Sequence, residues 1–364
     1  MMDRIPDEFL EKIKSTGIDI RDRSSTASYI QIDDDVVKDI VLDIMRKKGI
    51  IVEPLDAAMD KYEWVEDYLW GTIEIKSEKP KKRLRGYFIY VPKNLVVKNP
   101  IQACFLVSRP GFVQEVHNLV VIDENAELNL LTGCTTAVNE GFHLGISEFY
   151  IKKSAKLTYT MIHNWTPDFK VRPITGVIVE ENGEFISNYI NFAPGSWMKA
   201  NPKIYLKRNA KTSNNSLIIG KSNAFIDNGP SIFLEGEGAR AEIISRAISF
   251  EKSQLIMRGE IIAKAPNTKG HIECKGLTLS KDSIITAVPV LESQTTDSEL
   301  THEASIGKIS REQIEYLMAR GFTEDEAISL IVRGFMDIEI LGLTKEFKAY
   351  IRKVLDQIAE SSGM

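Results

Sequence analysis

The segment "ENAEL" (Glu124–Leu128) sets a small residue among charged and polar ones, directly before an apolar run. The same arrangement returns in "KSAKL", "ENGEF", "RNAKT" and "EGARA". The small residues at its centre are Ala126, Ala155, Gly183, Ala210 and Ala239, so the spacings are 29, 28, 27 and 29 residues. A sixth, weaker anchor is Pro266 in "KAPNT", 27 residues further on. A nearly constant period of this length indicates a solenoid.

Each repeat is built from strands and turns. Between about residues 85 and 300, short runs rich in Val, Ile, Tyr and Phe alternate with small polar residues, and no long helical period appears. We therefore predict a mainly β protein whose core, residues 85–302, is a parallel β-helix. Equivalent side chains of successive coils would then stack about 4.8 Å apart, the spacing of paired strands.

Helical patterns flank this core, in an N-terminal region at 1–84 and a C-terminal region at 303–364. Residues 33–49, "DDDVVKDIVLDIMRKKG", combine an i, i+4 apolar spacing with acidic residues at the start and basic residues at the end, as a helix favours. Residues 57–71 predict a second helix. Two capping boxes, Ser310 with Gln313 and Thr323 with Glu326, predict C-terminal helices that cover the last coil, and Gly321 would end the first of them.

Composition excludes several classes of protein. The 364 residues carry a net charge of −5, with 46 basic and 51 acidic side chains, which argues against a nucleic-acid partner. No apolar stretch approaches the length of a membrane span, and the first residues lack the apolar centre of a signal peptide. We expect a cytoplasmic protein without a membrane partner.

The three cysteines, Cys104, Cys134 and Cys274, lie far apart, which argues against a disulfide framework. The positions eight residues past each anchor would form one inward column, namely Cys134, His163, Asn191, Ile218, Ala247 and Cys274. Five coil steps, or about 24 Å, would separate the two cysteines at its ends. Two interpretations stay open: both cysteines are small buried core residues, or both take part in chemistry. The apolar context of Cys104 indicates a core residue.

Cys274 lies in "GHIECKG", and a thiolate beside an imidazole and a carboxylate suits iron or zinc. One thiolate cannot complete a four-coordinate metal site, so other ligands must come from elsewhere. The candidates are His302, Glu303, Glu292, or the same residues of a second chain. The alternative for each is an ordinary role, since an exposed Glu or a hydrogen-bonded His is commoner than a metal ligand.

Catalytic motifs are absent from the sequence. It contains no P-loop, no dinucleotide-binding glycine pattern, no nucleophile elbow and no HExxH segment, so we expect no nucleotide hydrolysis by this chain. A β-helix carbohydrate lyase or hydrolase remains a remote alternative. Such an enzyme would need paired carboxylates and bases along one outer sheet, and these do not occur at the repeat spacing.

The segment "LTHEASIGKISREQIEYLMARGFTEDEAISLIVRGFM" (Leu300–Met336) resembles the C-terminal signature of the SufB/SufD family, the scaffold proteins of SUF-type iron–sulfur cluster assembly. Further segments agree in order: "GYFIYVPKN", "ENAELNLLTGCTTA", "FHLGISEFYI", "LTYTMIHNW" and "GHIECKGLTLSKDSIITAVPVLES". The resemblance covers roughly residues 85–340. It implies a right-handed parallel β-helix with helical segments at both ends.

The same resemblance implies partners and a cargo. Family members work with SufC, an ABC-type ATPase that binds the C-terminal helices, so ATP hydrolysis is expected in the partner. Two β-helix proteins pair side by side, as a homodimer or with a SufD-like chain, and a transient iron–sulfur cluster is proposed to form between them. Sulfur comes from a cysteine desulfurase or another donor. A flavin is possible in the family, but nothing in the sequence indicates one.

By position, Cys274 matches the SufB cysteine proposed as a cluster ligand, and Cys134 matches the cysteine proposed to accept persulfide sulfur. His302 and Glu303 match a His-Glu pair of SufB where SufD commonly has His-Gly, which places the chain nearer SufB. Thr301 departs from SufB, which often has Glu there, and the N-terminal region is short for a SufB. The expected function is therefore a non-enzymatic scaffold. A SufD-like structural partner without its own cluster is the alternative.

Overall fold

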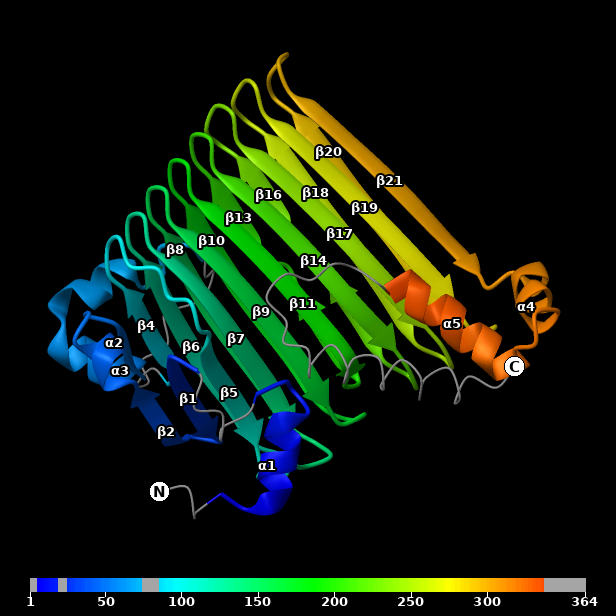
Figure 1. The fold of residues 1–364 in the computed structure, drawn as a ribbon, viewed down its shortest axis with the longest axis horizontal. Helices are drawn as coiled ribbons and strands as arrows, with labels where there is room; N and C mark the ends of the chain where they lie inside the picture. The colour runs from blue at the N-terminus through cyan, green and yellow to red at the C-terminus, as the bar shows by residue number, and fades with distance from the viewer. Residues whose placement is uncertain (1–4, 19–24, 74–84, 337–364) are drawn as a thin grey trace.

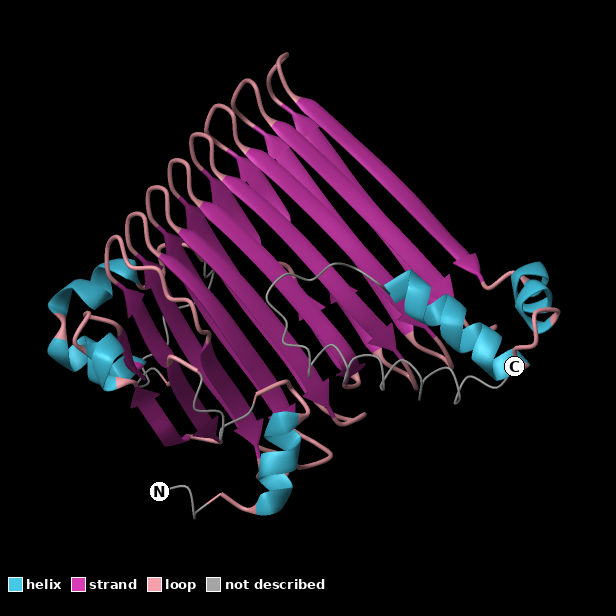
Figure 2. Ribbon diagram, viewed as in Figure 1, coloured by secondary structure: helices cyan, strands magenta, loops and turns pink. Residues whose placement is uncertain are grey.

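The computed structural model describes residues 5–18, 25–73 and 85–336. The described chain winds into a β-solenoid of about eight turns, which confirms the predicted mainly β fold (Figures 1 and 2). Two long sheets face each other across a buried core of apolar side chains. None of the helices in the described ranges is long and apolar enough to cross a membrane.

The first sheet contains ten of the described strands. Their order is β2 (Asp35–Val41), β1 (Ala27–Ile32), β5 (Ile101–Val107), β7 (Glu127–Thr136), β9 (Lys156–Trp165), β11 (Glu184–Pro194), β14 (Lys211–Gly220), β17 (Arg240–Ser249), β19 (Lys269–Thr278) and β21 (Glu299–Lys308). Every pairing from β1 to β21 is parallel, and β2 joins the N-terminal edge antiparallel to β1.

The second sheet closes the other side of the coil. Its strands in chain order are β3 (Ile51–Pro54), β4 (Tyr87–Val91), β6 (Val113–Ile122), β8 (Phe142–Ile151), β10 (Lys170–Val179), β12 (Trp197–Ala200), β13 (Lys203–Leu206), β15 (Phe225–Asn228), β16 (Ser231–Leu234), β18 (Gln254–Ala263) and β20 (Ile284–Ser293). β20 pairs with β18 and is the last strand of this sheet, as β21 is of the first.

The turn before each first-sheet strand explains the repeat. The residue ahead of each small anchor has a positive φ: Asn125, Ser154, Asn182, Asn209 and Gly238 lie between 54° and 75°. Asparagine and glycine tolerate this left-handed conformation better than most residues. In the next coil the equivalent residue is Asn267 (φ 57°), so the sixth anchor is Thr268 and not Pro266. The predicted register was therefore wrong by two residues in that coil.

The helix predicted at 33–49 was wrong. Residues 35–41 form strand β2, and only Asp43–Arg46 is helical, as the single turn α2. Pairing with β1 outweighs the i, i+4 apolar spacing, because the Val and Ile residues of this segment suit a strand as well as a helix. The second N-terminal prediction was right in kind: helix α3 (Leu55–Lys61) and the 3₁₀ helix η2 (Glu63–Tyr68) cover residues 55–68.

The C-terminal helices are α4 (Arg311–Met318) and α5 (Glu324–Met336). Thr323 and Glu326 form the predicted capping box, with Glu326 accepting a bond from the Thr323 N–H at 2.7 Å. Ser310 precedes α4 as predicted but makes no side-chain cap bond. Gly321 follows α4 with a φ of 100°. The strand before these helices, β21, ends at Lys308 and not near residue 302.

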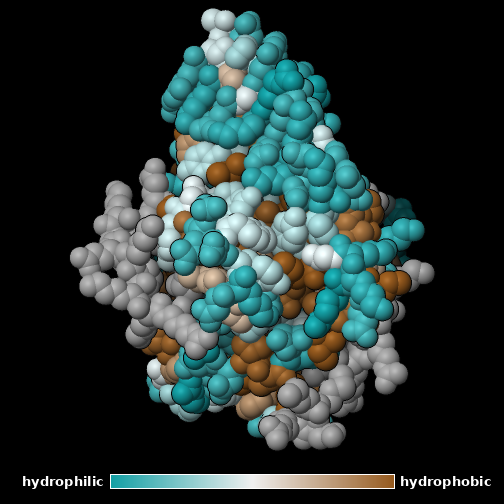
Figure 3. All heavy atoms as spheres, turned by 90° about the vertical axis from the view of Figure 1, so that its left-hand side faces the viewer, coloured by the Kyte–Doolittle hydropathy of each residue, from teal (hydrophilic) through white to brown (hydrophobic). Residues whose placement is uncertain are grey.

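Helices cover parts of the outer surface of the first sheet. α5 packs Ile328 and Val332 into a second apolar cluster that includes Ile219 and Ile248 of the sheet (Figure 1). At the other end, α1 (Asp7–Lys14) lies over the strand that carries Cys104, so this cysteine is buried as predicted. Figure 3 views the N-terminal end, where hydrophobic residues lie mainly in the lower half, among hydrophilic ones.

Candidate functional site

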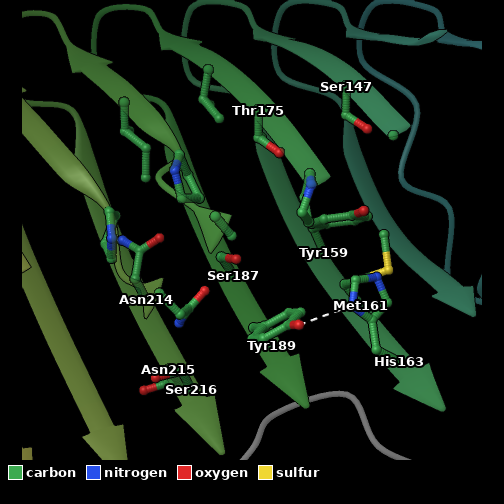
Figure 4. Close-up of a pocket in the computed structure, with 18 of the residues that line it drawn as sticks. Ser147, Tyr159, Met161, His163, Thr175, Ser187, Tyr189, Asn214, Asn215 and Ser216 are labelled. Atoms are coloured by element: carbon green, nitrogen blue, oxygen red, sulfur yellow. Dashed lines mark hydrogen bonds between the residues drawn. The ribbon is translucent and has the colours of Figure 1, made fainter. Parts of the chain in front are cut away.

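A cavity of about 90 Å³ runs inside the coil, between the two sheets (Figure 4). Its lining extends from Phe105 and Cys134 to Ser245, which lies on β17. Many lining residues are polar but uncharged, among them Ser147, Thr175, Ser187, Asn214, Asn215 and Ser216. Since one ordered water needs about 10–15 Å³ by this measure, the cavity has room for several waters or for a small ion with its ligands.

The predicted inward column exists for five of its six members. Cys134 pairs with His163, His163 with Asn191, and the column continues through Ile218 and Ala247. Its next member is Gly276 and not Cys274. The placement of Cys274 in this column was wrong, because the anchor of its coil lies two residues later than predicted.

Cys274 belongs to a second column of stacked residues. On each strand, this column lies two residues before the column of Cys134. It pairs with Ser245 of β17, which pairs with Ser216 of β14. The same column continues through Tyr189 to Met161. Its members between Cys274 and Met161 all carry hydroxyl groups and line the cavity, whereas Ile218 and Ala247 interrupt the column of Cys134.

Cys134 is almost completely buried at the N-terminal end of the cavity. Its Sγ lies 3.8 Å from the Sδ of Met161, and its backbone pairs with Phe105 on one side and His163 on the other. Burial raises the pKa of the Cys134 thiol well above its ordinary value, and the nearby Cys104 adds to this rise. The thiol is therefore neutral at pH 7, and an external sulfur donor can reach it only if the coil opens locally.

His163 is held by a short chain of hydrogen bonds. Its Nδ1 lies 2.9 Å from the hydroxyl of Tyr189 (dashed line in Figure 4). That hydroxyl also accepts a bond from Asn191 at 2.9 Å and donates to the Sδ of Met198 at 2.8 Å. Burial, with a smaller contribution from the neighbouring His143, lowers the pKa of His163 to about 3. The imidazole is therefore neutral.

Cys274 is buried one strand from the C-terminal edge of the first sheet. Its neighbour on the last strand, β21, is Ala304, whose side chain is small. Burial, together with a smaller contribution from the charge of Glu273, raises the pKa of Cys274 to about 11, although Arg246 opposes this rise. The thiol would ionise only when a metal or a cation displaces its proton.

His302 lies on the same face of the sheet as Cys274. His302 pairs with Ile272, whose side chain points into the core, so the side chain of His302 starts from the inner face too. The Cα atoms of Cys274 and His302 are one strand and two residues apart, or about 8 Å. Because β21 is the last strand, His302 is exposed.

The two glutamates predicted as ligands face elsewhere. Glu303 pairs with Glu273 on the outer face, where Lys275 bridges the two carboxylates at 2.6 and 3.2 Å, and Arg246 also pairs with Glu273. Glu292 lies on β20 of the other sheet, pairs with Ile262 and accepts a bond from Gln294. Within the described ranges, no group of three His, Cys, Asp or Glu side chains is placed to hold a metal ion. One chain therefore does not assemble the predicted ligand set.

The C-terminal end of the coil is open among the described residues. Within residues 5–18, 25–73 and 85–336, β20 and β21 each pair along one side only, so each presents a row of backbone groups without a strand partner on the other. Such edges bind further strands readily. Exposed apolar side chains on these strands include Ile284, Val290 and Ile306. Cys274 and His302 lie directly under this end.

The hydroxyl-lined column and the cavity were missed at the sequence level. Their signal is present in the repeat: Tyr159, Ser187 and Asn214 all stand four residues past their anchors, on the inward face. Tyr189 and Ser216 stand six residues past theirs. Polar residues at successive even positions of a β-helix indicate a wet interior.

Comparison with known proteins identifies the family of this chain. Residues 105–335 match the family described as "SUF system FeS cluster assembly, SufBD core domain". An iron–sulfur cluster assembly SufBD family protein of Archaeoglobus fulgidus is 42% identical over 352 residues, covering 95% of this chain and 94% of the relative. Another, of Methanothermobacter thermautotrophicus, is 37% identical over 364 residues, covering 97% of this chain and 88% of the relative. One from Staphylococcus saprophyticus is 28% identical, covering 99% and 80%.

Proposed function

The chain belongs to the SufBD family of iron–sulfur cluster assembly proteins, and on this premise we propose that it is a scaffold on which a nascent cluster is built. The observation that carries the proposal is the position of Cys274. It is a thiol one strand from an open sheet edge, with the His302 imidazole on the same face. The chain itself performs no ATP hydrolysis in this proposal.

Cys274 and His302 are the cluster ligands supplied by one chain. Thiolate sulfur and imidazole nitrogen are both established ligands of iron in clusters. Two ligands leave a cluster incomplete, so the remaining ones come from a second subunit. Glu303 and Glu292 face away from Cys274 and become assisting ligands only if the partner's contact turns the edge strands.

Dimerisation occurs at the open end of the coil. The free edges of β20 and β21 offer backbone donors and acceptors to the strands of a second subunit, and the exposed Ile306 adds apolar contact. This favours an end-to-end arrangement over the side-by-side one expected from the family resemblance. The partner is a second copy of this chain or a SufD-like chain.

The C-terminal helices bind the ATPase. α4 and α5 bury one side against the first sheet, and large apolar or aromatic side chains stay exposed on them or between them: Tyr316, Met318, Phe322 and Leu330. Exposed apolar side chains that are close together often mark a protein contact. The ATPase would then act beside the open end, because α4 follows β21 directly.

Sulfur enters at Cys134 and is used at Cys274. When the coil opens locally, the Cys134 thiol loses its proton and attacks the outer sulfur of a donor persulfide. The donor S–S bond breaks, the donor leaves as a thiol that takes up this proton, and Cys134 becomes a persulfide. The cavity and the column of Tyr189, Ser216 and Ser245 give a polar interior path that ends beside Cys274. A cysteine desulfurase is the expected donor.

Two substitutions separate sulfur entry from cluster binding. With Cys134→Ser, assembly from a persulfide donor should fail, whereas assembly from free sulfide should persist. With Cys274→Ser, assembly should fail with both sulfur sources. Absorption spectra of the anaerobic complex with its ATPase measure the cluster. Wild-type cluster content in Cys274→Ser with both sources would refute the scaffold proposal.

The alternative role, a SufD-like structural partner, rests on Thr301, which replaces an acidic residue frequent in SufB. Thr301 accepts or donates a hydrogen bond with His271 Nδ1 at 2.8 Å on the outer face. In this role the isolated chain, reconstituted anaerobically with iron and sulfide, forms no cluster but still raises the yield of the assembled complex. Iron analysis of the isolated chain distinguishes the two roles.

A further inference from the structure

Three residues with soft or borderline ligand atoms line the N-terminal end of the cavity. The ligand groups are the Sγ of Cys134 on β7, the Sδ of Met161 on β9, and the imidazole of His163 on β9. All three residues line the cavity. We propose that Cys134, Met161 and His163 form a binding site for a soft monovalent metal ion, Cu(I), inside the coil.

The sulfur atoms already have a suitable separation. Cys134 Sγ and Met161 Sδ lie 3.8 Å apart. Two sulfurs bound to one metal at about 2.3 Å, with a trigonal angle of about 120°, lie about 4.0 Å apart. An ion can therefore bind between them without a large movement of either strand.

The hydrogen bonds of His163 leave its second nitrogen free to bind a metal. The Tyr189 hydroxyl donates to Met198 and accepts from Asn191, so its remaining bond with His163 is one in which Nδ1–H donates. With the hydrogen bonds assigned in this way, the proton is on Nδ1 and Nε2 carries a lone pair. The hydrogen bond of His163 with Tyr189 is made through Nδ1. Metal-binding histidines commonly have this arrangement, with the other ring N–H held by a neighbour.

The two nitrogens of an imidazole are separated by one ring carbon, so the directions of their N–H bond and lone pair diverge widely. Since Nδ1 points toward Tyr189 on β11, Nε2 points away from that strand, and β7 with Cys134 lies on the other side of β9. Cys134 and His163 are direct partners in the ladder between β7 and β9. Cys134, Met161 and His163 thus all line one volume inside the coil.

Charge favours a monovalent ion. No Asp, Glu, Lys or Arg is among the described residues that line the cavity. Cu(I) with one thiolate is neutral, whereas Zn²⁺ with the same ligands would leave a net positive charge in a buried volume, at a large desolvation cost. Thioether sulfur also favours Cu(I) over zinc. On binding, the metal replaces the proton of the Cys134 thiol, and that proton leaves to the solvent.

This inference does not rest on the scaffold proposal, although both use Cys134. An ion bound there would occupy the thiolate that receives sulfur, so the two uses exclude each other. Metal binding is measured without any sulfur donor, iron or ATPase, so its failure would leave cluster assembly untouched.

Competitive titration of the apo chain tests the site. Cu(I) is added anaerobically to the full chain in the presence of bicinchoninate, a coloured Cu(I) chelator. We expect one ion per chain, no competition from equimolar Zn²⁺, and X-ray absorption with two sulfurs and one nitrogen around copper. Cys134→Ser should abolish binding, and Met161→Leu should weaken it at least about tenfold. Met257→Leu, a buried methionine that does not line the cavity, is the matched control.

A second variant keeps the test valid if Cys134→Ser does not fold. Tyr189→Phe removes the hydroxyl that orients His163 and should lower Cu(I) affinity about 10- to 100-fold, with a circular dichroism spectrum like that of wild type. The proposal is overturned if the wild-type chain binds no Cu(I), if Zn²⁺ binds more tightly, or if Cys274→Ser abolishes binding and Met161→Leu does not change it.

Discussion

Cys274 and His302 start from the same face of the first sheet, on neighbouring strands, whereas Glu303 starts from the opposite face. The alternation of side chains along a strand therefore divides the His-Glu pair between two environments. His302 lies with Cys274 at the open end of the core. Glu303 lies outside, bound to Lys275.

The first prediction follows from this division. His302→Ala should lower the cluster content of the anaerobic complex severalfold, because it removes the second ligand on the inner face. Glu303→Gln is the matched control and should retain most of the cluster, because its side chain faces the outer ion pairs. Iron and sulfide analysis of both variants measures the effect. An equal loss of iron and sulfide in both variants would show that the face of the sheet from which a side chain starts does not determine the cluster ligands.

The second prediction concerns the open end. Ile306→Lys sets a charge beside the free edge of β21 and should weaken dimerisation at least about tenfold, or by about 1.4 kcal/mol. Ile44→Lys changes a still more exposed isoleucine at the N-terminal end and should have no effect. Sedimentation velocity over a concentration series gives both dissociation constants. If Ile44→Lys weakens the dimer and Ile306→Lys does not, the interface lies at the N-terminal end of the coil instead.

The third prediction concerns the helices. Phe322→Asp and Leu330→Asp should each weaken binding of the ATPase about 10-fold or more, because a charge then replaces an exposed apolar contact. The control is Val96→Asp, which changes an exposed valine outside the C-terminal helices. Calorimetric titration with the ATPase measures affinity. Unchanged binding by both helix variants would place the ATPase on another surface.

The fourth prediction concerns acid stability. Burial lowers the pKa of both His143 and His163 to about 3, so below pH 6.5 the unfolded chain binds protons that the folded chain excludes. The contribution of these two neutral histidines to the free energy of unfolding is fully present above pH 6.5, and it is lost as the pH falls toward 3. Lowering the pH from 6.5 to 4.5 should reduce the free energy of unfolding by about 2–3 kcal/mol for each histidine. In the double variant His143→Gln/His163→Gln, the free energy of unfolding measured in urea should depend less steeply on pH than in wild type. The same slope in both proteins would contradict this prediction.

Much of the fold was predictable from local chemistry. The left-handed turn residue at Asn125 and its equivalents recurs visibly, and five anchors place the inward column through Ala247. The sixth anchor failed because Pro266 resembles a turn residue, while the positive φ falls on Asn267. Because side chains alternate along a strand, an error of two residues leaves Cys274 on the inner face but assigns it to the wrong column.

Other features depend on long-range pairing and could not be predicted locally. Residues 35–41 satisfy a helical spacing, yet β1 supplies a partner strand. The end of β21 at Lys308 is set by pairing with β19, which continues past His302. The Cys134–Met161 contact joins side chains on adjacent strands, with Met161 two residues from His163, the direct partner of Cys134, and side-chain packing sets it.

Iron retained by the purified complex tests the central claim most directly. The chain is coexpressed with its ATPase, purified without oxygen, and compared as wild type, Cys274→Ser and Cys104→Ser, the last being a buried cysteine under α1. The scaffold account predicts cluster absorption and iron in wild type and Cys104→Ser, with both lost in Cys274→Ser. Wild-type levels of iron and sulfide in Cys274→Ser would contradict it.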